Sequence, residues 1–296
     1  MTTLPTDAIT SEGNLHETII NPEIRHSIES YNIISFTEAT NPGCALRVQQ
    51  IQGESYVTAG FVFASGLDSH GRLQPELDRS RGDNVTYYYA QSIENTSPND
   101  DEGSVRVVDI PEGGGIEDLA AYRYSKATLT PEMDAYLHTL VAESGTSAVR
   151  EVAALAHTDD ANPLVSFELI RHIIQEAIVK KSDETWLITF APSAYKAVRK
   201  NFGDKVMHVV AEKVQVDVGD DRTSSELWLQ PVITRPIDVL DNLVKELKSD
   251  DISESHKTTI FRTFVFMLDG LDDVYLSGEV RDYRDNVFSN VLPIKR

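Results

Sequence analysis

The chain has 296 residues, of which 41% are apolar, and this suffices for one large domain or for one domain with a helical appendage. It carries 27 basic and 47 acidic side chains, and the formal net charge of -20 disfavours nucleic acid, anionic membranes and acidic carrier proteins as partners. No apolar run reaches the length of a membrane-spanning helix, and the single cysteine, Cys44, excludes an internal disulfide.

The first twelve residues are polar and lack the basic-then-apolar order of a secretory signal peptide, so we expect a cytoplasmic protein. Cys44 has no histidine at a suggestive spacing and is interpreted as a small packing residue. The eight histidines show no metal-ligand spacing, and no metal is expected. Polar stretches predict tails or loops at residues 1–17, 92–103, 112–115 and 219–225.

In the first half of the chain the sequence predicts one helix and two strands. The helix surrounds Arg47, and an acidic run from Glu76 to Asp83 follows it. Alternating apolar residues then indicate strands at residues 84–91 and 104–110, the second of which carries Arg106.

Residues 147–203 hold the clearest pattern, in which two strands alternate with two helices. The strands are predicted at Val149 to His157 and at Trp186 to Phe190. A long helix with one apolar face lies between them, and Pro192 begins a second helix that Gly203 ends. The core face of the long helix is predicted from Leu164, Phe167, Ile170, Ile174, Ala177 and Ile178. This alternation favours a largely parallel sheet whose carboxyl ends bind the ligand.

The last part of the chain is predicted to contain a closing strand at residues 226–235 and two helices. Pro236 begins the first helix, and the second spans residues 253–271. The second helix has a broad apolar stripe that the domain or a second subunit must cover. Packing against the domain is favoured, and a homodimer through these helices is the alternative.

Glu151 is an acidic residue inside an apolar predicted strand. A carboxylate among apolar neighbours costs free energy unless it is paired, hydrogen-bonded or protonated. One explanation is a general base in an active site. The other is structural: the side chain points outward, or it pairs with Arg150 or Arg106.

The charge is unevenly distributed along the chain. Residues 161–214 contain eight basic and six acidic side chains, whereas the rest of the chain contains 19 basic and 41 acidic ones. An anionic ligand would therefore find its most tolerant surface near the helix that Pro192 begins. For each of these lysines taken singly, an ordinary solvated helix face is the alternative.

The strand around Glu151 resembles a strand of a known enzyme family. Its sequence from Arg150 to Ala156, Arg-Glu-Val-Ala-Ala-Leu-Ala, looks like the Trp-Glu-(Leu/Ile)-Ser-Arg-Phe strand of the acyl-homoserine-lactone synthases. The order of Arg47, Tyr56 and the acidic run upstream is similar too, and the likeness spans roughly residues 30 to 235. The chain thus resembles the GNAT-type N-acyltransferases, in the branch of the acyl-homoserine-lactone and N-acyl amino acid synthases.

This resemblance implies a mixed α/β fold, with a central sheet flanked by helices. It implies a polar tail at residues 1–30, an acyltransferase domain at 31–235 and a helical extension at 236–296. The implied reaction transfers an acyl group from acyl-CoA, acetyl-CoA or an acyl carrier protein to the amine of a small molecule, without a metal. Because the chain is so acidic, free acyl-CoA is favoured over a carrier protein as the donor.

The resemblance also implies site residues. Glu151 would remove the amine proton, and the hydroxyl of Tyr195 would protonate the leaving thiolate. The implied cofactor-binding residues are Ala154, Leu155, Ala156, Arg199 and Lys200, and the implied substrate-binding residues are Arg47, Tyr56, Asp78, Asp83 and Arg106. The charged residues of the substrate set have a competing interpretation as surface charges or structural ion pairs.

Two departures from the family pattern bear on function. Ala153 and Ala154 stand where the lactone synthases have Ser-Arg, which argues against homoserine-lactone synthesis. The loop from His157 to Val165 contains no glycine, whereas the phosphate loop of GNAT-type enzymes is glycine-containing. The competing hypothesis is therefore a GNAT-shaped binding or regulatory module without acyl transfer.

Overall fold

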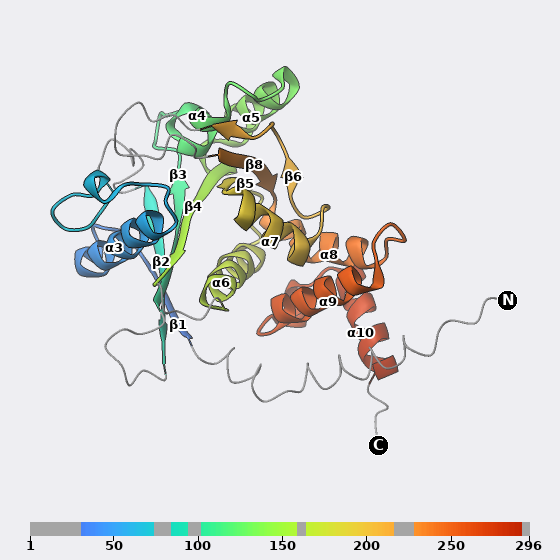
Figure 1. Cartoon of the computed structure of the whole chain (residues 1–296). Helices are drawn as coiled ribbons and strands as arrows, with labels where there is room; N and C mark the ends of the chain where they lie inside the picture. Colours follow the sequence, from blue (N-terminus) through green and yellow to red (C-terminus); the bar gives the residue numbers. More distant parts are fainter. Residues whose placement is uncertain (1–30, 74–83, 94–101, 159–163, 216–227, 292–296) are drawn as a thin grey trace.

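An eight-stranded sheet runs through the centre of the molecule, with helices on both faces (Figure 1). The computed structural model describes residues 31–73, 84–93, 102–158, 164–215 and 228–291. The strands follow the order β1-β2-β3-β4-β5-β8-β6, and β7 pairs with β8. Their bounds are β1 Tyr31–Phe36, β2 Val85–Ser92, β3 Glu102–Asp109, β4 Val149–His157, β5 Thr185–Phe190, β6 His208–Val209, β7 Val214–Gln215 and β8 Trp228–Thr234. The predicted mixed α/β class is confirmed.

The sheet is mostly antiparallel, so the expectation of a largely parallel sheet was wrong. Of the pairs between these strands, only β4 with β5 is parallel. One helix, α6 (Leu164–Lys180), connects these two strands and returns the chain to the same end of the sheet. After α7 (Pro192–Phe202) the chain continues through β6 and β7, so β8 enters from the opposite end. Alternation of strands and helices alone does not distinguish these two connections.

Helices cover the sheet as two layers (Figure 1). On one face lies α3 (Pro42–Thr58), and beyond it are α4 (Ala120–Ser125) and α5 (Pro131–Ser144). On the other face lie α6 and α7. Each layer has its own cluster of buried apolar side chains. The sheet therefore separates two cores, and partly buried Cys44 packs against the one beneath α3, as predicted for a packing residue.

The predicted core face of α6 is partly wrong. Ile174, Ala177 and Ile178 are buried as expected, but Leu164 is exposed. Two predicted core residues, Phe167 and Ile170, are only partly buried against the cluster. The buried face is instead completed by Val165, Leu169 and Ile173, and it includes Glu168. The apolar residues of α6 cover more than one face of the helix, so packing against the sheet decides which of them are buried.

Gly203 ends α7, as predicted from the sequence. Its φ of +79° lies in the left-handed region, which glycine adopts without a steric penalty. A Cβ atom at this position would lie 2.5 Å from Cγ of Glu246 in the following helical layer. The glycine therefore both ends α7 and permits close packing.

Several short or polar elements were not predicted. They include β1 at the sheet edge, the six-residue α4, the two-residue strands β6 and β7, and helices α5 and α10 (Gly278–Val291). Short elements hold too few residues for a periodic pattern, and α10 is rich in charged residues. Helix α5 does have local signals, because Thr130 caps its start, Pro131 is its first residue and Gly145 ends it.

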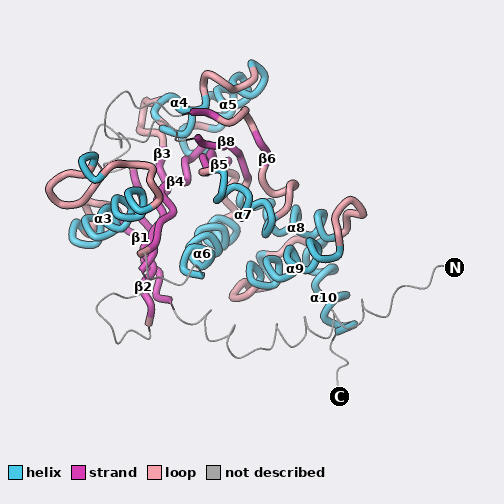
Figure 2. Tube along the Cα trace, in the orientation of Figure 1, coloured by secondary structure: helices cyan, strands magenta, loops and turns pink. Residues whose placement is uncertain are grey.

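The C-terminal helices pack beside α6 and α7 (Figure 2). These helices are α8 (Val239–Leu247), α9 (Glu254–Leu268) and α10, and a short turn of 3-10 helix precedes α8. The apolar stripe of α9 buries Ile260, Phe264 and Met267 against the chain itself. The favoured prediction for this stripe is confirmed. A homodimer through these helices and a domain boundary at residue 235 stay predictions.

A buried charge network fastens α6 to the end of α9. Glu168 is 2% exposed, and its carboxylate lies 2.6 Å from Nη2 of Arg171. Arg171 also pairs with Asp269 at 3.2 Å and lies over the ring of Phe266. Gln175 donates hydrogen bonds to the carbonyl oxygens of Met267 and Asp269. Burial raises the pKa of Glu168 to about 7, against the opposing effect of Arg171.

Among the described residues, no helix has both the length and the apolar character needed to cross a membrane.

We predict that Glu168→Gln gains stability relative to the wild type as the pH rises. A carboxyl whose folded pKa is raised binds its proton more tightly when folded, so its contribution to the free energy of unfolding falls between about pH 4.5 and 7. Glutamine lacks this loss, which is on the order of 3 kcal/mol. Urea denaturation at pH 5 and 8 measures the difference.

Glu176→Gln on the same helix is the matched control, and its stability relative to the wild type should change with pH in the opposite direction. Hydrogen bonds from Lys180 and Tyr88 lower the pKa of Glu176 despite burial, so its contribution is lost on acidification. If the free energies of unfolding of both variants change with pH in the same direction, the opposite pKa shifts assigned to Glu168 and Glu176 are wrong.

Candidate active site

A cavity of about 260 Å³ lies where β4 and β5 separate. The two strands pair in register only from Val149 opposite Thr185 to Val152 opposite Ile188. Beyond that point β4 continues beside β3, and β5 continues beside β8. Ala153, Ala154 and Leu155 therefore line the cavity with their backbone edge instead of pairing with β5.

A bulge in β4 accompanies the separation. Between Ser104 and Arg106 of β3 there is one intervening residue, whereas their partners on β4, Ala156 and Ala153, enclose two. The extra residue places Ala154 at a φ of +52°, in the left-handed region. Non-glycine residues rarely adopt this region, and they are enriched where a site needs a particular backbone direction. The bulge bends β4 away from β5 beside the cavity.

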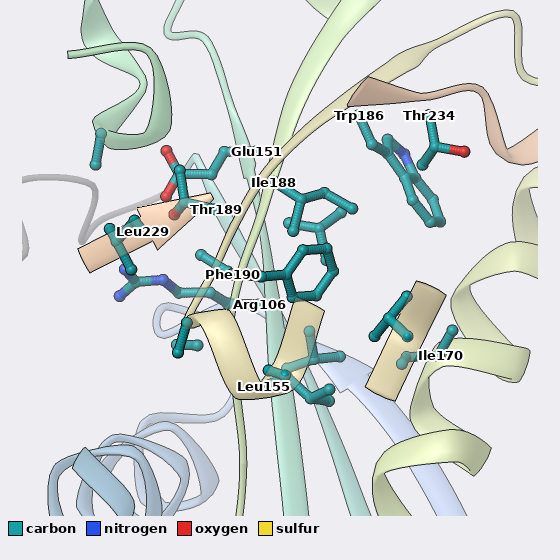
Figure 3. Close-up of a pocket in the computed structure, with 18 of the residues that line it drawn as sticks. Arg106, Glu151, Leu155, Ile170, Trp186, Ile188, Thr189, Phe190, Leu229 and Thr234 are labelled. Atoms are coloured by element: carbon teal, nitrogen blue, oxygen red, sulfur yellow. The ribbon is translucent and has the colours of Figure 1, made fainter. Parts of the chain in front are cut away.

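The charged and hydroxyl-bearing lining residues gather at one side of the cavity, beside apolar ones such as Phe61, whose ring packs against that of Tyr56. Glu151 is 3% exposed, and its carboxylate accepts a 2.9 Å hydrogen bond from the backbone N–H of Ala121 at the start of α4. Arg106 of β3 lines the same side, as do Tyr56 of α3 and Tyr124 of α4. In Figure 3, Glu151, Arg106 and Thr189 gather at one side of the cavity. A carboxylate and a guanidinium therefore face the same space.

The rest of the cavity is apolar and reaches the opposite face of the sheet. It is bounded by β5, by the inner faces of α6 and α7, and by the start of α8. In Figure 3, Ile170 and Trp186 lie across the cavity from Arg106. The apolar lining side chains are Ile170, Ile173, Ile174, Trp186, Ile188, Phe190, Val198, Val206, Met207 and Val239. The cavity passes through the sheet, from a side that holds the charged groups to a side with apolar lining.

The structure excludes two of the structural interpretations of Glu151, an outward-pointing side chain and a pair with Arg150. Its side chain does not point outward, because it is buried. Arg150 is engaged elsewhere, in ion pairs with Asp109 at 2.6 Å and with Glu184 at 3.2 Å. Arg106 lies in the same cavity as Glu151, so a structural pair and a catalytic pair both remain consistent with the geometry.

The structure brings some of the other predicted site residues to the cavity and leaves others away from it. Tyr56, Arg106, Ala154 and Leu155 line the cavity with Glu151. Ala156 is buried in the core beneath α3. Asp78 and Asp83 lie outside the described residues.

Arg47 and Arg199 already have carboxylate partners. Nε of Arg47 donates a 2.9 Å hydrogen bond to Glu102, which also accepts from the hydroxyl of Tyr89. Arg199 pairs with Asp204 on the outer surface of α7. Arg47 therefore has the structural ion pair that the competing interpretation expected, away from the cavity lining.

Lys200 and Tyr195 also lie on α7. Lys200 is exposed, and Tyr195 is partly buried against the core of α6 and α7. Tyr195 directly follows Ala194, which lines the cavity. Neither side chain is among the lining residues.

Sequence reasoning missed most of the lining side chains, and Tyr124, Thr189 and Trp186 are three examples. Tyr124 belongs to α4, which is too short to give a periodic pattern. Thr189 and Trp186 lie in a correctly predicted strand, but nothing in the sequence showed that β4 leaves this strand beyond Ile188. In the described part of the chain, no group of three or more His, Cys, Asp and Glu side chains is arranged to hold a metal ion.

No protein-family model matches the sequence, and no curated protein is similar to it. Among solved structures, the chain is similar to FeeM, an N-acyl amino acid synthase from uncultured soil microbes, with 13% identity over 72% of this chain and 96% of that one, and a TM-score of 0.43. It is similar to BjaI, a CoA-dependent acyl-homoserine lactone synthase with SAM and isopentyl-CoA, with 10% identity over 71% and 87% of the two chains and a TM-score of 0.46.

A third similar structure is the CoA-dependent acyl-homoserine lactone synthase MesI, with 11% identity over 83% of this chain and 100% of that one, and a TM-score of 0.42. BjaI and MesI are by name acyl-homoserine lactone synthases, and FeeM is by name an N-acyl amino acid synthase. Identities and scores this low leave the chemistry of the chain to be argued from its own residues.

We predict that Ala154→Gly is at least as stable as the wild type, whereas Ala154→Val is less stable by roughly 1 to 3 kcal/mol. Glycine adopts a positive φ without strain, and a β-branched residue there is strongly disfavoured. Thermal unfolding of the three proteins measures the order.

Ala156→Gly, two residues along the same strand, is the matched control. Ala156 does not have a positive φ, so glycine should lower stability there by about 1 kcal/mol. The same loss at both positions would contradict the bulge.

Proposed function

We propose that the protein is an N-acyltransferase that moves an acyl group from a thioester donor to the amine of a small molecule. The observation that supports it is the cavity through the opened sheet, which has a buried carboxylate on one side and an apolar chamber on the other. An acyl thioester has a reactive polar end and an apolar tail. A single straight ligand of this kind would match both sides.

Glu151 is the proposed base. It would take a proton from the acceptor amine, whose lone pair then attacks the thioester carbon to form the new C–N bond. Its carboxylate is held by the N–H of Ala121, so the side chain has a fixed direction toward the cavity. Holding amine and thioester together would supply much of the rate through proximity.

The opened edge of β4 is the proposed site of the thioester carbonyl. A backbone N–H near Ala154 or Leu155 would donate a hydrogen bond to the oxygen as negative charge develops on it. The C–S bond then breaks, and the leaving thiolate takes a proton. Tyr195 is the proposed donor of this proton, and Tyr124 is a second hydroxyl that lines the cavity.

The remaining charged residues would bind the polar parts of the reactants. Arg106 and Tyr56 lie on the Glu151 side and would order the acceptor. Arg199 and Lys200 lie on α7, whose Ala194 and Val198 line the apolar side, and they would attract the phosphates of CoA. Asp204 partly neutralises Arg199, so its contribution would be modest.

A non-catalytic binding module is the second candidate. The observation that favours it is the set of internal partners of Arg47 and Arg199, which resemble fold-supporting ion pairs. Such a module would bind a ligand in the cavity without turnover. The role of Glu151 separates the two candidates.

We predict that Glu151→Gln lowers the rate of acyl transfer by about 100-fold or more while donor binding stays within a few fold. Glutamine keeps an oxygen that can accept from Ala121 but cannot take the amine proton. Thiol release from straight-chain acyl-CoAs in the presence of mixed amino acids and amines measures the rate, and calorimetry measures binding.

Glu132→Gln, on the exposed face of α5, is the control and should retain full activity. Binding without turnover in the wild type would support the binding module. Equal turnover in wild type and Glu151→Gln would refute the role of the base.

We predict that acyl-CoA binds more weakly as salt rises, and that Arg199→Ala weakens binding by a few fold at low salt. Phosphate contacts with exposed cations are screened, whereas burial of the acyl chain is not. Calorimetry at about 0.02 and 0.3 M salt, with Lys257→Ala on α9 as control, measures the difference. If the acyl group is transferred from an acyl carrier protein but not from CoA, the donor is the carrier protein and the proposed CoA site is wrong.

A further inference from the structure

The cavity is open at one end and closed at the other. Ala194 is exposed, and Phe190, Ala191 and Leu155 are partly exposed, so the cavity reaches the surface between β4 and α7. At the opposite end the lining residues are buried. Their exposed fractions are 3% for Trp186, 3% for Thr234, 1% for Val206 and 1% for Val239.

The sheet is continuous at the level of Trp186. Trp186 pairs with Arg150 of β4 on one side and with Thr234 of β8 on the other. A ligand that enters through the gap beyond Val152 and Ile188 therefore cannot pass between the strands here. In Figure 3, Trp186 and Thr234 lie together at this end.

The polar atoms of this end are satisfied within the chain. The hydroxyl of Thr234 donates a 2.7 Å hydrogen bond to the carbonyl of Val206. Nε1–H of Trp186 donates a 2.6 Å hydrogen bond to Oε1 of Glu184. The end wall therefore presents apolar surface, which suits a hydrocarbon terminus and not a polar group.

The indole of Trp186 is held in place by a buried network. Besides the indole, the carboxylate of Glu184 accepts a 2.7 Å hydrogen bond from Ser182, and it pairs with Arg150 at 3.2 Å. Arg150 in turn pairs with Asp109 at 2.6 Å. Glu184 is 5% exposed, so the hydrogen bonds that its carboxylate accepts are weakly screened by solvent, whereas the pair of Arg150 with Asp109 is about a third exposed. A side chain held in this way forms a rigid wall rather than a movable one.

We propose that Trp186 is the closed end of the cavity and limits the length of the acyl chain that the protein accepts, with Glu184 as the positioning residue of its indole. This inference rests on the proposed acyl transfer. A cavity of about 150 Å³ already holds benzene, so about 260 Å³ has room for on the order of ten non-hydrogen atoms. The substrate class is therefore a medium-length straight acyl chain.

Tryptophan fluorescence tests where the chain ends. The protein has two tryptophans, and the second, Trp228, is 44% exposed and does not line the cavity. In Trp228→Phe, emission comes from Trp186 alone. We expect saturated fatty acids and acyl-CoAs of four carbons to bind without changing this emission, and chains of eight to ten carbons to change it.

Variants of Trp186 test the length limit. Trp186→Phe shortens the wall, and each further methylene that becomes buried should improve binding by about fourfold. We expect the ratio of twelve-carbon to eight-carbon affinity to rise by about tenfold or more. Trp228→Phe is the matched control and should keep the wild-type profile.

Variants of Glu184 test the positioning role. Glu184→Gln keeps an oxygen that accepts from the indole, whereas Glu184→Ala removes it. We expect Glu184→Ala to broaden the chain-length profile and Glu184→Gln to leave the profile unchanged. A purely structural role would lower the thermal stability of both variants without changing either profile.

Two results would overturn the inference. One is an emission of Trp186 that is unchanged by every bound chain, a test that needs no Trp186 variant to fold. The other is a wild-type chain-length profile in folded Trp186→Phe. If fatty acids give the expected profile but no acyl group is ever transferred, the closed end stands and the acyltransferase proposal fails. If acyl transfer occurs and the chain-length profile of Trp186→Phe is unchanged, the acyltransferase proposal stands and the closed end fails.

Discussion

The separation of β4 from β5 is the constraint on which the rest of the site depends. Two parallel neighbours in a sheet normally satisfy each other's backbone groups along their whole length. Here the pairing ends at Val152 and Ile188, and a bulge with Ala154 at positive φ bends β4 away. The opened edge gives a ligand access to backbone groups and lets one cavity reach both faces of the sheet.

The layers on each face give the opening its chemical asymmetry. On the α3 side, the start of α4 supplies the N–H of Ala121 to Glu151, and burial of a carboxylate is tolerated because it is hydrogen-bonded. On the α6 side, apolar side chains line the space, and Trp186 closes it. The same gap therefore joins charged groups on one face of the sheet to an apolar chamber on the other. This division supports acyl transfer better than it supports hydrolysis of a polar substrate.

The C-terminal helices act on the site through its walls. Contacts of α9 with α6 and α7 hold the two helices whose inner faces bound the apolar chamber. The Glu168–Arg171–Asp269 network fixes α6 against the end of α9, and Gln175 reinforces it. Because a packed wall of this kind does not deform freely, the chamber keeps a defined size. Selection of acyl chains by their length requires a chamber with fixed walls.

The local elements around the site, and the importance of one residue, could be predicted from the amino-acid sequence. The strand at Val149 to His157, the long helix after it and the helix ended by Gly203 follow from apolar periodicity, caps and turn residues, which act over a few residues. Glu151 was recognisable because a carboxylate in an apolar strand requires an explanation. Strand direction, the bulge and the gap at Ile188 could not be predicted in this way. The same is true of the partners of Arg47, Arg150 and Trp186. These depend on contacts between residues far apart in the chain, and a local pattern does not record which distant strand, helix or charge lies alongside.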